Sequence, residues 1–345
     1  MGLRYVYFFL KWKKDTYMTR RNKDKFKTAH TRACSPSNSC MPGLRASIVG
    51  WIRKNSVANT GATYATYQKQ YVAYAQSKNL NPRAAESVCD FLKHGLENRK
   101  LGRITRTKVI PAAIAGLYKF DEAPLQWDAL VQGTKSVIKR NTKPSKPRKP
   151  MTHAHLKKMA RECENTVKEV RDVLLFIMMF LGLLRESEAV ALEDKDVWVD
   201  EVEGYDRQMM YIVIRKSKTD QTGETATVVL SACPESDICP VRWLQHYRSL
   251  RGKATCLFAK TDVGGPLAKR TVRALVKAWL LRIGVNPEGY GSHSMRRGGA
   301  TAAVAANVKM HVLKRHGRWA SDAVYLYVVD AMAEKLSLSR SILEQ

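Results

Sequence analysis

The sequence predicts a mainly α-helical protein with one small antiparallel β-sheet, an α+β fold in two domains. From Leu44 onward, apolar residues recur at the three- and four-residue spacing of amphipathic helices over most of the chain. Only one stretch, MMYIVIRKSKTDQTGETATVVL, indicates strands, at about 209–215 and 225–230, around a polar turn containing glycine. A length of 345 residues and a basic, proline-rich segment near the middle favour two domains.

The charge of the chain is large and uneven. The net charge is +28, from 59 Lys and Arg against 31 Asp and Glu. Residues 1–150 hold 30 basic and 8 acidic side chains, a net of +22, whereas residues 151–345 hold 29 and 23, a net of +6. Basic groups near phosphates release condensed counterions, so the excess predicts a polyanionic partner, most simply nucleic acid, held mainly by the first part.

Residues 1–43 read as a basic, weakly ordered arm, with a mitochondrial presequence as the alternative. No apolar stretch reaches the length of a membrane span, so no membrane partner is expected. The seven cysteines form no CxxC pair. Cys233 and Cys239 flank a proline-containing loop, and reduced thiols are a better interpretation of them than a disulfide or metal site.

A helical domain is expected over 44–140, with helices around 84–97, 107–119 and 124–139. The segment YATYQKQYVAY places four tyrosines on one helix face: Tyr64, Tyr67, Tyr71 and Tyr74. Such a stripe could stack on bases. Packing into the core of the domain is the interpretation that the spacing favours.

The linker between the domains is expected at 141–150, inside the basic segment KSVIKRNTKPSKPRKP, Lys135 to Pro150. This segment has seven basic residues, three prolines and no acid, so it should be extended and fairly stiff. It could simply be a soluble linker, but the absence of acids favours a strap along a phosphate backbone. The residues expected to touch DNA there are Lys143, Lys146, Arg148 and Lys149.

The second domain is expected over 151–330, helix-rich around the two strands, with a tail helix at 331–345. Arg185 follows ten uncharged residues, 173–182, and begins a helix, so it is either an anion ligand or the partner of Glu186 or Glu188. Lys218 lies at the hairpin tip, where a lysine can reach into a groove or simply be solvated.

The stretch GSHSMRRGGATAA contains the strongest local pattern. His293 and Arg296 share one face of the first turn of a helix, where free backbone N–H groups and the helix dipole also favour an anion. Gly298 and Gly299 let another element or a nucleic-acid backbone come close. A fourth polar piece follows in RHGRWASDAVYLYV.

These four pieces, in this order, resemble the tyrosine recombinase (phage integrase) family, most closely recombinases of Crypton- and DIRS-type transposons and some phage relatives. The resemblance implies a helical, SAM-like core-binding domain and a tyrosine-recombinase catalytic domain that together form a C-shaped DNA clamp. Matching the motifs residue by residue gives the expected catalytic set: Arg185, Lys218, His293, Arg296, Trp319 and the nucleophile Tyr327. The alternates are Lys216 for the lysine, His316 and Arg318 for the tryptophan, and Tyr325 for the nucleophile; Arg297 is a further DNA-binding candidate.

The activity that the resemblance implies is cleavage and rejoining of double-stranded DNA through a covalent 3′-phosphotyrosyl intermediate, without metal, cofactor or ATP. Protomers would assemble on DNA, as a tetramer in the synaptic complex, with the tail docked on a neighbour or folded back on its own domain. The protein would work in the nucleus of a eukaryote, or in the cytoplasm or nucleoid otherwise. The alternatives are a non-catalytic DNA-binding protein derived from a transposon and a type IB topoisomerase.

Overall fold

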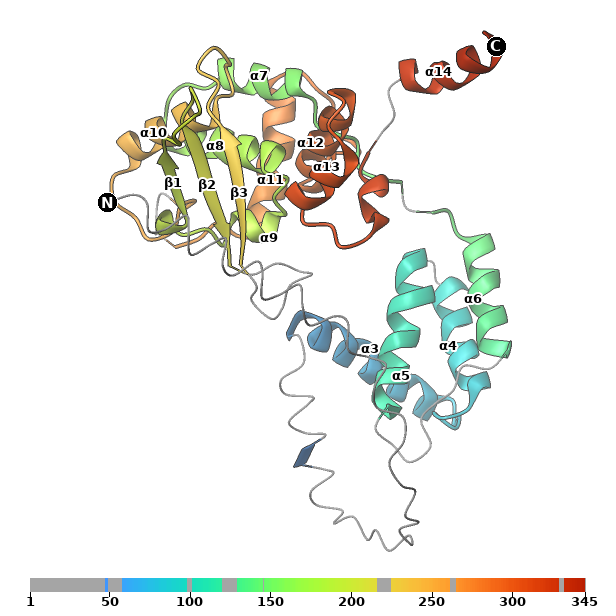
Figure 1. The fold of residues 1–345 in the computed structure, drawn as a ribbon. Coiled ribbons are helices and arrows are strands. Elements are labelled where there is room, and N and C mark those ends of the chain that lie inside the picture. Colours follow the sequence, from blue (N-terminus) through green and yellow to red (C-terminus); the bar gives the residue numbers. More distant parts are fainter. Residues whose placement is uncertain are drawn as a thin grey trace, which may run out of the picture. The chain divides into compact units, whose positions relative to one another are not determined.

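The chain folds into two compact units, Met1–Pro144 and Ser145–Gln345, each with its own core (Figure 1). The computed structural model describes residues 47–48, 58–97, 101–119, 129–144, 146–215, 225–260, 265–328 and 332–344. The arm expected at 1–43 lies outside these ranges. The boundary between the units falls inside the 141–150 segment.

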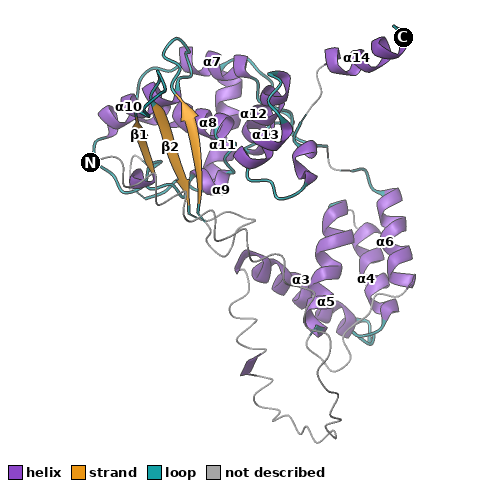
Figure 2. Ribbon diagram, viewed as in Figure 1, coloured by secondary structure: helices purple, strands orange, loops and turns teal. Residues whose placement is uncertain are grey.

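The first unit is all helical in its described part (Figure 2). Its elements are α3 (Ala58–Ser77), α4 (Ala85–Glu97), the π-helical turn η1 (Thr105–Val109), α5 (Ile110–Tyr118) and α6 (Ala129–Asn141). The core is built by Tyr71, Val88, Leu92, Ile110, Ile114, Tyr118 and Ile138. Tyr71 is fully buried and Tyr67 packs against this core, so the tyrosine stripe of α3 serves packing, as the spacing favoured.

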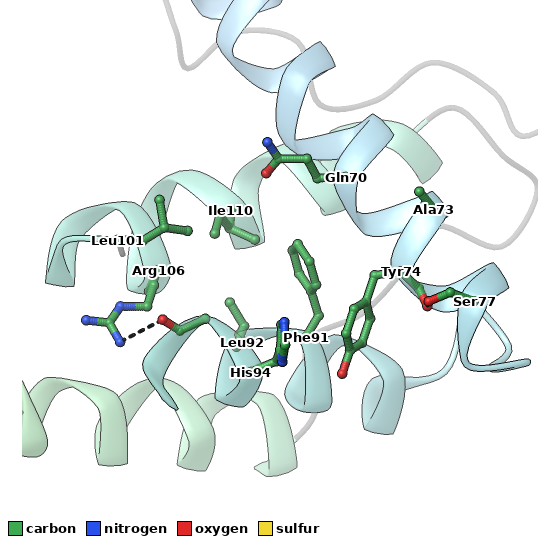
Figure 3. A pocket seen from close by; sticks show the side chains of 11 residues that line it. Gln70, Ala73, Tyr74, Ser77, Phe91, Leu92, His94, Leu101, Arg106 and Ile110 are labelled. Carbon is green, nitrogen blue, oxygen red and sulfur yellow. Dashed lines mark hydrogen bonds between the residues drawn. The ribbon is translucent and has the colours of Figure 1, made fainter. Parts of the chain in front are cut away.

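A cavity of about 700 Å³ opens between α3, α4 and η1 (Figure 3). Its walls are mainly apolar and aromatic, and include Tyr74, Phe91 and Leu101. Tyr74 donates its hydroxyl to Asp90 at 2.8 Å, and the buried Arg106 donates Nη1 to the Gly95 carbonyl at 3.3 Å. Tyr74, the fourth tyrosine of the stripe, therefore lines this cavity inside the first unit.

The second unit contains a three-stranded antiparallel sheet of order β1-β2-β3. The strands are β1 (Val197–Asp200), β2 (Met209–Ile214) and β3 (Ala226–Ser231). Alternate residues of β2 and β3 are buried, as a half-covered sheet requires, and helix α10 packs against both strands. Two of these strands were expected from the sequence, whereas β1 was not, since a four-residue strand offers too little alternation to detect.

The helices of the second unit follow in chain order. They are α7 (His153–Arg161), α8 (Val167–Leu181), α9 (Glu186–Ala189), the 3₁₀ turn η2 (Asp194–Asp196), α10 (Pro240–Arg251), α11 (Lys269–Arg282), α12 (His293–Ala305), α13 (Met310–His316), the 3₁₀ turn η3 (Asp322–Leu326) and α14 (Met332–Leu343). Helix α8 begins at its cap Thr166 and is buried from Val170 to Phe180, so it is the centre of the core. None of the described helices combines the length and hydropathy that crossing a bilayer requires.

Two glycines of α12 allow close packing, Gly298 against the backbone of Met151 and Gly299 against α8. A Cβ on Gly298 would lie 1.9 Å from the Met151 carbonyl oxygen, and one on Gly299 would lie 2.0 Å from that of Phe180. The small residues after Arg296 thus admit another protein element, which was one of the two interpretations of this run. This close approach brings Arg296 beside the end of α8.

Cys233 and Cys239 of the second unit are the two thiols for which a disulfide or metal site was the alternative. Cys233 and Cys239 are free, and the Cys233 backbone N–H donates to Cys239 Sγ at 3.3 Å. Within the described ranges, no cluster of three or more His, Cys, Asp or Glu side chains is arranged to hold a metal ion.

Candidate active site

Arg296 is the centre of the site. Its side chain is completely buried, and its guanidinium donates to the backbone carbonyls of Leu183 and Gly317. These carbonyls lie in the loop after α8 and in the turn after α13. Arg296 therefore joins three segments that are far apart in the sequence.

Arg185 caps the N-terminus of α9 and lies close enough to Arg296 to affect its charge. Arg185 does pair locally, as its Nη1 donates to Glu188 Oε1 at 2.5 Å. Burial, followed by the charges of Arg185 and Arg318, lowers the pKa of Arg296 to about 9. Arg185 thus pairs with Glu188 and lies close to Arg296 at the same time. Glu188 lies behind the Arg185 guanidinium.

Three guanidinium groups therefore gather around one carboxylate, so the site has an excess of buried positive charge. Arg318 donates Nη2 to Glu188 Oε2 at 2.9 Å, which places it on the other side of this carboxylate. Nε of Arg296 is buried and has no hydrogen-bond partner among the described residues. Guanidinium groups bind phosphate oxygens by charge-assisted, often bidentate bonds, so a phosphate would balance this charge.

Tyr327 follows the turn η3 and faces the arginines. The centroid of its ring lies 5.6 Å from Arg296 Cζ and 5.3 Å from the Trp319 ring centroid. The turn is fixed by the buried Val324 and by the Tyr327 N–H, which donates to the Val324 carbonyl at 2.8 Å. Tyr325, the alternate nucleophile, is 58% exposed on the same turn.

Trp319 stacks on Arg296, with the ring centroid 4.1 Å from Arg296 Cζ. A cation over an aromatic face is attracted to the ring, which holds the guanidinium in place. The Trp ring occupies the space beside Gly317, where a Cβ would lie only 1.8 Å from it. Of the residues considered for the His or Trp position, Trp319 is the one that touches both Arg296 and Tyr327.

The two alternates for that position have other partners. His316 hydrogen-bonds through Nε2 to the Leu181 carbonyl at 2.8 Å, and burial lowers its pKa, so it is neutral at pH 7. Arg318 has a positive φ of 57° and bonds Glu188 and three carbonyl oxygens. The contact between Arg318 and Glu188 could not be predicted from spacing, since they lie 130 residues apart.

His293 is exposed at the first turn of α12, one turn before Arg296. Its charge acts on Glu186, whose pKa burial would raise but which hydrogen bonds from Arg273 and Ser292, together with this charge, lower. Arg273 of α11 donates Nε to Glu186 Oε2 at 3.1 Å. Glu186 is thus the partner of Arg273 and not of Arg185, and Arg273 was missed because nothing in its local sequence marks it.

Arg297 forms a bond within the chain that sequence reasoning did not anticipate. Its Nη1 donates to the Leu326 carbonyl at 2.5 Å, and Thr301, one helical turn later, donates Oγ1 to the Tyr327 carbonyl at 3.4 Å. Both bonds tie α12 to the backbone on either side of the tyrosine. Arg297 therefore holds the turn that carries Tyr327. The DNA contact expected for Arg297 stays a prediction for its remaining N–H groups.

The end of the linker runs along the segment before His293. Lys149 N–H donates to the Gly289 carbonyl at 2.9 Å, and its Nζ lies 5.6 Å from the Tyr290 ring centroid. The Arg148 side chain lies beside Gly291. Two basic side chains of the linker, Arg148 and Lys149, thus lie beside the segment that leads into α12. The four linker residues expected to touch DNA are all exposed: Lys143, Lys146, Arg148 and Lys149.

The lysine candidates lie outside the described residues. Strand β2 ends at Ile214 and β3 begins at Ala226, and Lys216 and Lys218 fall in the stretch between them that is not described. The catalytic lysine therefore stays a prediction from the sequence.

Comparison with known proteins agrees with this geometry. The model of the phage integrase family matches residues 149–331. An "Integrase/recombinase xerD homolog" of Selenomonas ruminantium is 23% identical over 290 residues, which cover 80% of this chain and 83% of that protein.

Solved structures show the same fold. The XerH site-specific recombinase in a post-cleavage complex with its palindromic difH substrate has a TM-score of 0.61 at 18% identity, covering 87% of this chain and 85% of that one. The Tn1549 transposon integrase with transposon right end DNA has a TM-score of 0.59 at 13% identity, covering 88% and 98%. A lambda integrase tetramer on a Holliday junction has a TM-score of 0.58 at 14% identity, covering 85% and 79%.

Proposed function

Because the chain belongs to the phage integrase family, the tyrosine recombinases, we propose that it cleaves DNA with Tyr327 and rejoins the strands at a specific site. The observation that supports this best is that Trp319 and Tyr327 pack against Arg296, whose Nε has no hydrogen-bond partner among the described residues. A nucleophile and an anion site thus come from one folded unit.

The proposed reaction is a transesterification. The hydroxyl oxygen of Tyr327 attacks the scissile phosphorus, the bond from phosphorus to the 5′ oxygen breaks, and a 3′-phosphotyrosine and a free 5′ hydroxyl result. His293 accepts the tyrosine proton, and Lys218 protonates the leaving 5′ oxygen. Attack by a 5′ hydroxyl of a second strand reverses these steps and rejoins the DNA. The phosphotyrosyl bond replaces the broken ester, so rejoining requires no ATP.

The arginines supply the charge that the transition state needs. Negative charge builds on the non-bridging oxygens, and preorganised donors in a water-poor site stabilise it strongly. Arg296 and Arg185 would bind these oxygens, while Trp319 keeps Arg296 in position. In this role the guanidinium groups do what bound cations do in other phosphoryl-transfer sites.

DNA binding and assembly complete the proposal. The net charge of +22 on residues 1–150 supports a clamp in which both units hold the duplex and the basic linker lies along it. Relatives of the fold have been solved on DNA, one of them as a tetramer on a Holliday junction. Helix α14 exposes Leu336, Ile342 and Leu343, which supports docking of the tail on a neighbouring protomer in a synaptic tetramer.

The decisive experiment traps the covalent adduct. On a nicked substrate carrying the cognate site, the wild type should accumulate a protein–DNA adduct whose modified peptide contains Tyr327. Tyr327→Phe removes one oxygen, so it should fold and bind DNA but form no adduct. Tyr325→Phe, its matched control on the same turn, should keep most of the activity because Tyr325 is exposed, whereas Tyr327 lies against Arg296.

A DNA label on Tyr325, or an active Tyr327→Phe protein, would contradict the assignment. Tight binding to the cognate site with no adduct would favour the non-catalytic DNA-binding protein. Nicking and resealing without strand exchange would favour the topoisomerase.

A further inference from the structure

Arg318 is a buried charge for which the reaction just described has no use. Its side chain is 10% exposed, yet its backbone has a φ of 57°, in the left-handed region that side chains other than glycine rarely adopt. Residues held in such a conformation persist only where their surroundings fix them, and these cluster at functional sites. The side chain of Arg318 must therefore make contacts that outweigh the strain.

Those contacts connect the turn after α13 with the loop after α8. Arg318 donates Nη1 to the His316 carbonyl at 3.0 Å and to the Gly182 carbonyl at 3.4 Å. Its Nη2 donates to the Leu183 carbonyl at 3.1 Å and to Glu188 Oε2 at 2.9 Å. The planar fork of an arginine can serve all these acceptors at once, which a lysine cannot.

Glu188 links Arg318 to Arg185. The Glu188 side chain has no exposed surface, and it accepts bonds from Arg318, from Arg185 Nη1 at 2.5 Å and from the Arg185 backbone N–H at 2.9 Å. Glu188 is the residue with which the Arg185 guanidinium pairs in the described part of the chain, so the position of this guanidinium depends on the carboxylate. Arg318 in turn fixes the oxygen of Glu188 that is farther from the Arg185 guanidinium.

We propose that Arg318 is a positioning residue, which holds Glu188, and through it the Arg185 guanidinium, in the geometry that binds the scissile phosphate. It touches neither the phosphate nor the nucleophile. This inference rests on the proposed strand-cleavage function, and it assigns Arg318 a task different from that of Trp319 at the neighbouring position.

The charge of Arg318 also keeps Glu188 ionised. Burial would raise the pKa of Glu188, but the charge of Arg318, followed by the bonds and charge of Arg185, outweighs burial and lowers it. Arg296 of α12 is a further positive charge close to Glu188. A cavity of about 280 Å³ lies between Glu188 and one further group of charged side chains. That group consists of Arg215 and its ion-pair partners Glu193 and Asp196.

The test uses Arg318→Gly, because glycine suits the left-handed backbone and removes only the side chain. Single-turnover cleavage should slow about 100-fold, the scale expected for a misplaced catalytic group, while affinity for the DNA stays near that of the wild type. Arg318→Lys should fall between the two, because it retains the charge without the fork. The matched control is Arg161→Lys, which alters an exposed ion pair with Asp237 and should leave the rate unchanged.

A double-mutant cycle with Glu188→Gln separates positioning from direct contact. If Arg318 acts through Glu188, Arg318→Gly should slow the Glu188→Gln protein little further. The dependence of the cleavage rate on pH gives a second readout, which a loss of stability alone would not change. Without Arg318 the carboxyl of Glu188 protonates at higher pH, so the acid limb of the Arg318→Gly profile should shift upward, whereas Glu188→Gln should not show this limb.

Two outcomes would overturn the proposal: a wild-type rate for Arg318→Gly, or effects of the two substitutions that multiply. If Arg318→Gly does not fold, Arg318→Lys carries the same cycle. A measurement independent of cleavage uses inorganic phosphate, which should raise the Tm of the wild type and of Arg161→Lys more than that of Arg318→Gly or Glu188→Gln. An equal rise in all four would also contradict the proposal, whereas a wild type that forms no adduct contradicts the proposed function alone.

Discussion

At the scale of single residues, burial and charge oppose each other most strongly at Arg296. A buried cation is costly unless hydrogen bonds and counter-charges compensate for the lost water. Arg296 has two backbone carbonyls and the Trp319 ring for this purpose, but burial, together with the charges of Arg185 and Arg318, lowers its pKa to about 9. It remains charged at pH 7, and a bound phosphate would relieve the repulsion.

Arg296→Lys should therefore reduce cleavage far more than binding. A lysine at this position cannot donate to both carbonyls and to a phosphate, and its pKa falls readily on burial. We expect the single-turnover cleavage rate to drop by about 10²–10³-fold, the usual effect of losing one transition-state donor. The measurement is adduct formation over time on the nicked substrate, and a wild-type rate would refute the central place given to Arg296.

At the scale of elements, the contact between α8 and α12 positions the site. Helix α8 contributes the loop that carries Leu183 and Arg185, and α12 contributes Arg296 and the two side chains that bond the backbone around Tyr327. The helices can approach this closely only because Gly299 lacks a side chain, and Gly298 in the same way lets the backbone of Met151 come close to α12. The spacing between the two helices thus sets the spacing between the anion site and the nucleophile.

Gly299→Ala should destabilise the second unit by about 3 kcal/mol, because the added methyl group meets the Phe180 carbonyl, a backbone atom that cannot move aside. Thermal or denaturant unfolding of the purified protein measures this loss. Gly133→Ala on α6 is the contrasting case, since nothing lies within 4 Å of its new Cβ. It should stabilise the first unit by about 0.5–1 kcal/mol, and a loss of stability there would contradict the open environment of Gly133.

At the scale of the whole molecule, the two units divide the work. Residues 1–150 carry a net charge of +22 and the described helices there build a core of their own, whereas the second unit contains the anion site and Tyr327. Non-specific DNA binding and strand cleavage are therefore expected to be separable.

A protein that lacks residues 1–144 should bind the cognate DNA much more weakly, with a smaller dependence on salt. Each phosphate contact that is lost reduces the slope of log K against log salt by about 0.9. Titrations of labelled DNA at several salt concentrations measure both the affinity and this slope. An unchanged slope in the shortened protein would show that the basic first part does not contact the phosphates.

The sequence by itself determined the features that depend on local spacing. Strands β2 and β3 were predicted within one residue at either end, because alternation is a property of neighbouring positions. In the same way, the short motifs of the second unit predicted the phage integrase family. Helix α9 differs from the expected amphipathic helix because it is a single turn, after which the chain continues into η2 and β1.

Only the tertiary structure decided which groups act together. Spacing left His316, Arg318 and Trp319 open for one position, and packing placed Trp319 between Arg296 and Tyr327. It also brought Arg318 onto Glu188, which lies 130 residues away, and gave Arg297 the carbonyl of Leu326. A sequence motif records residue types in one segment, whereas a buried charge takes its partners from whichever segments the core brings next to it, so these partners appear only in the folded chain.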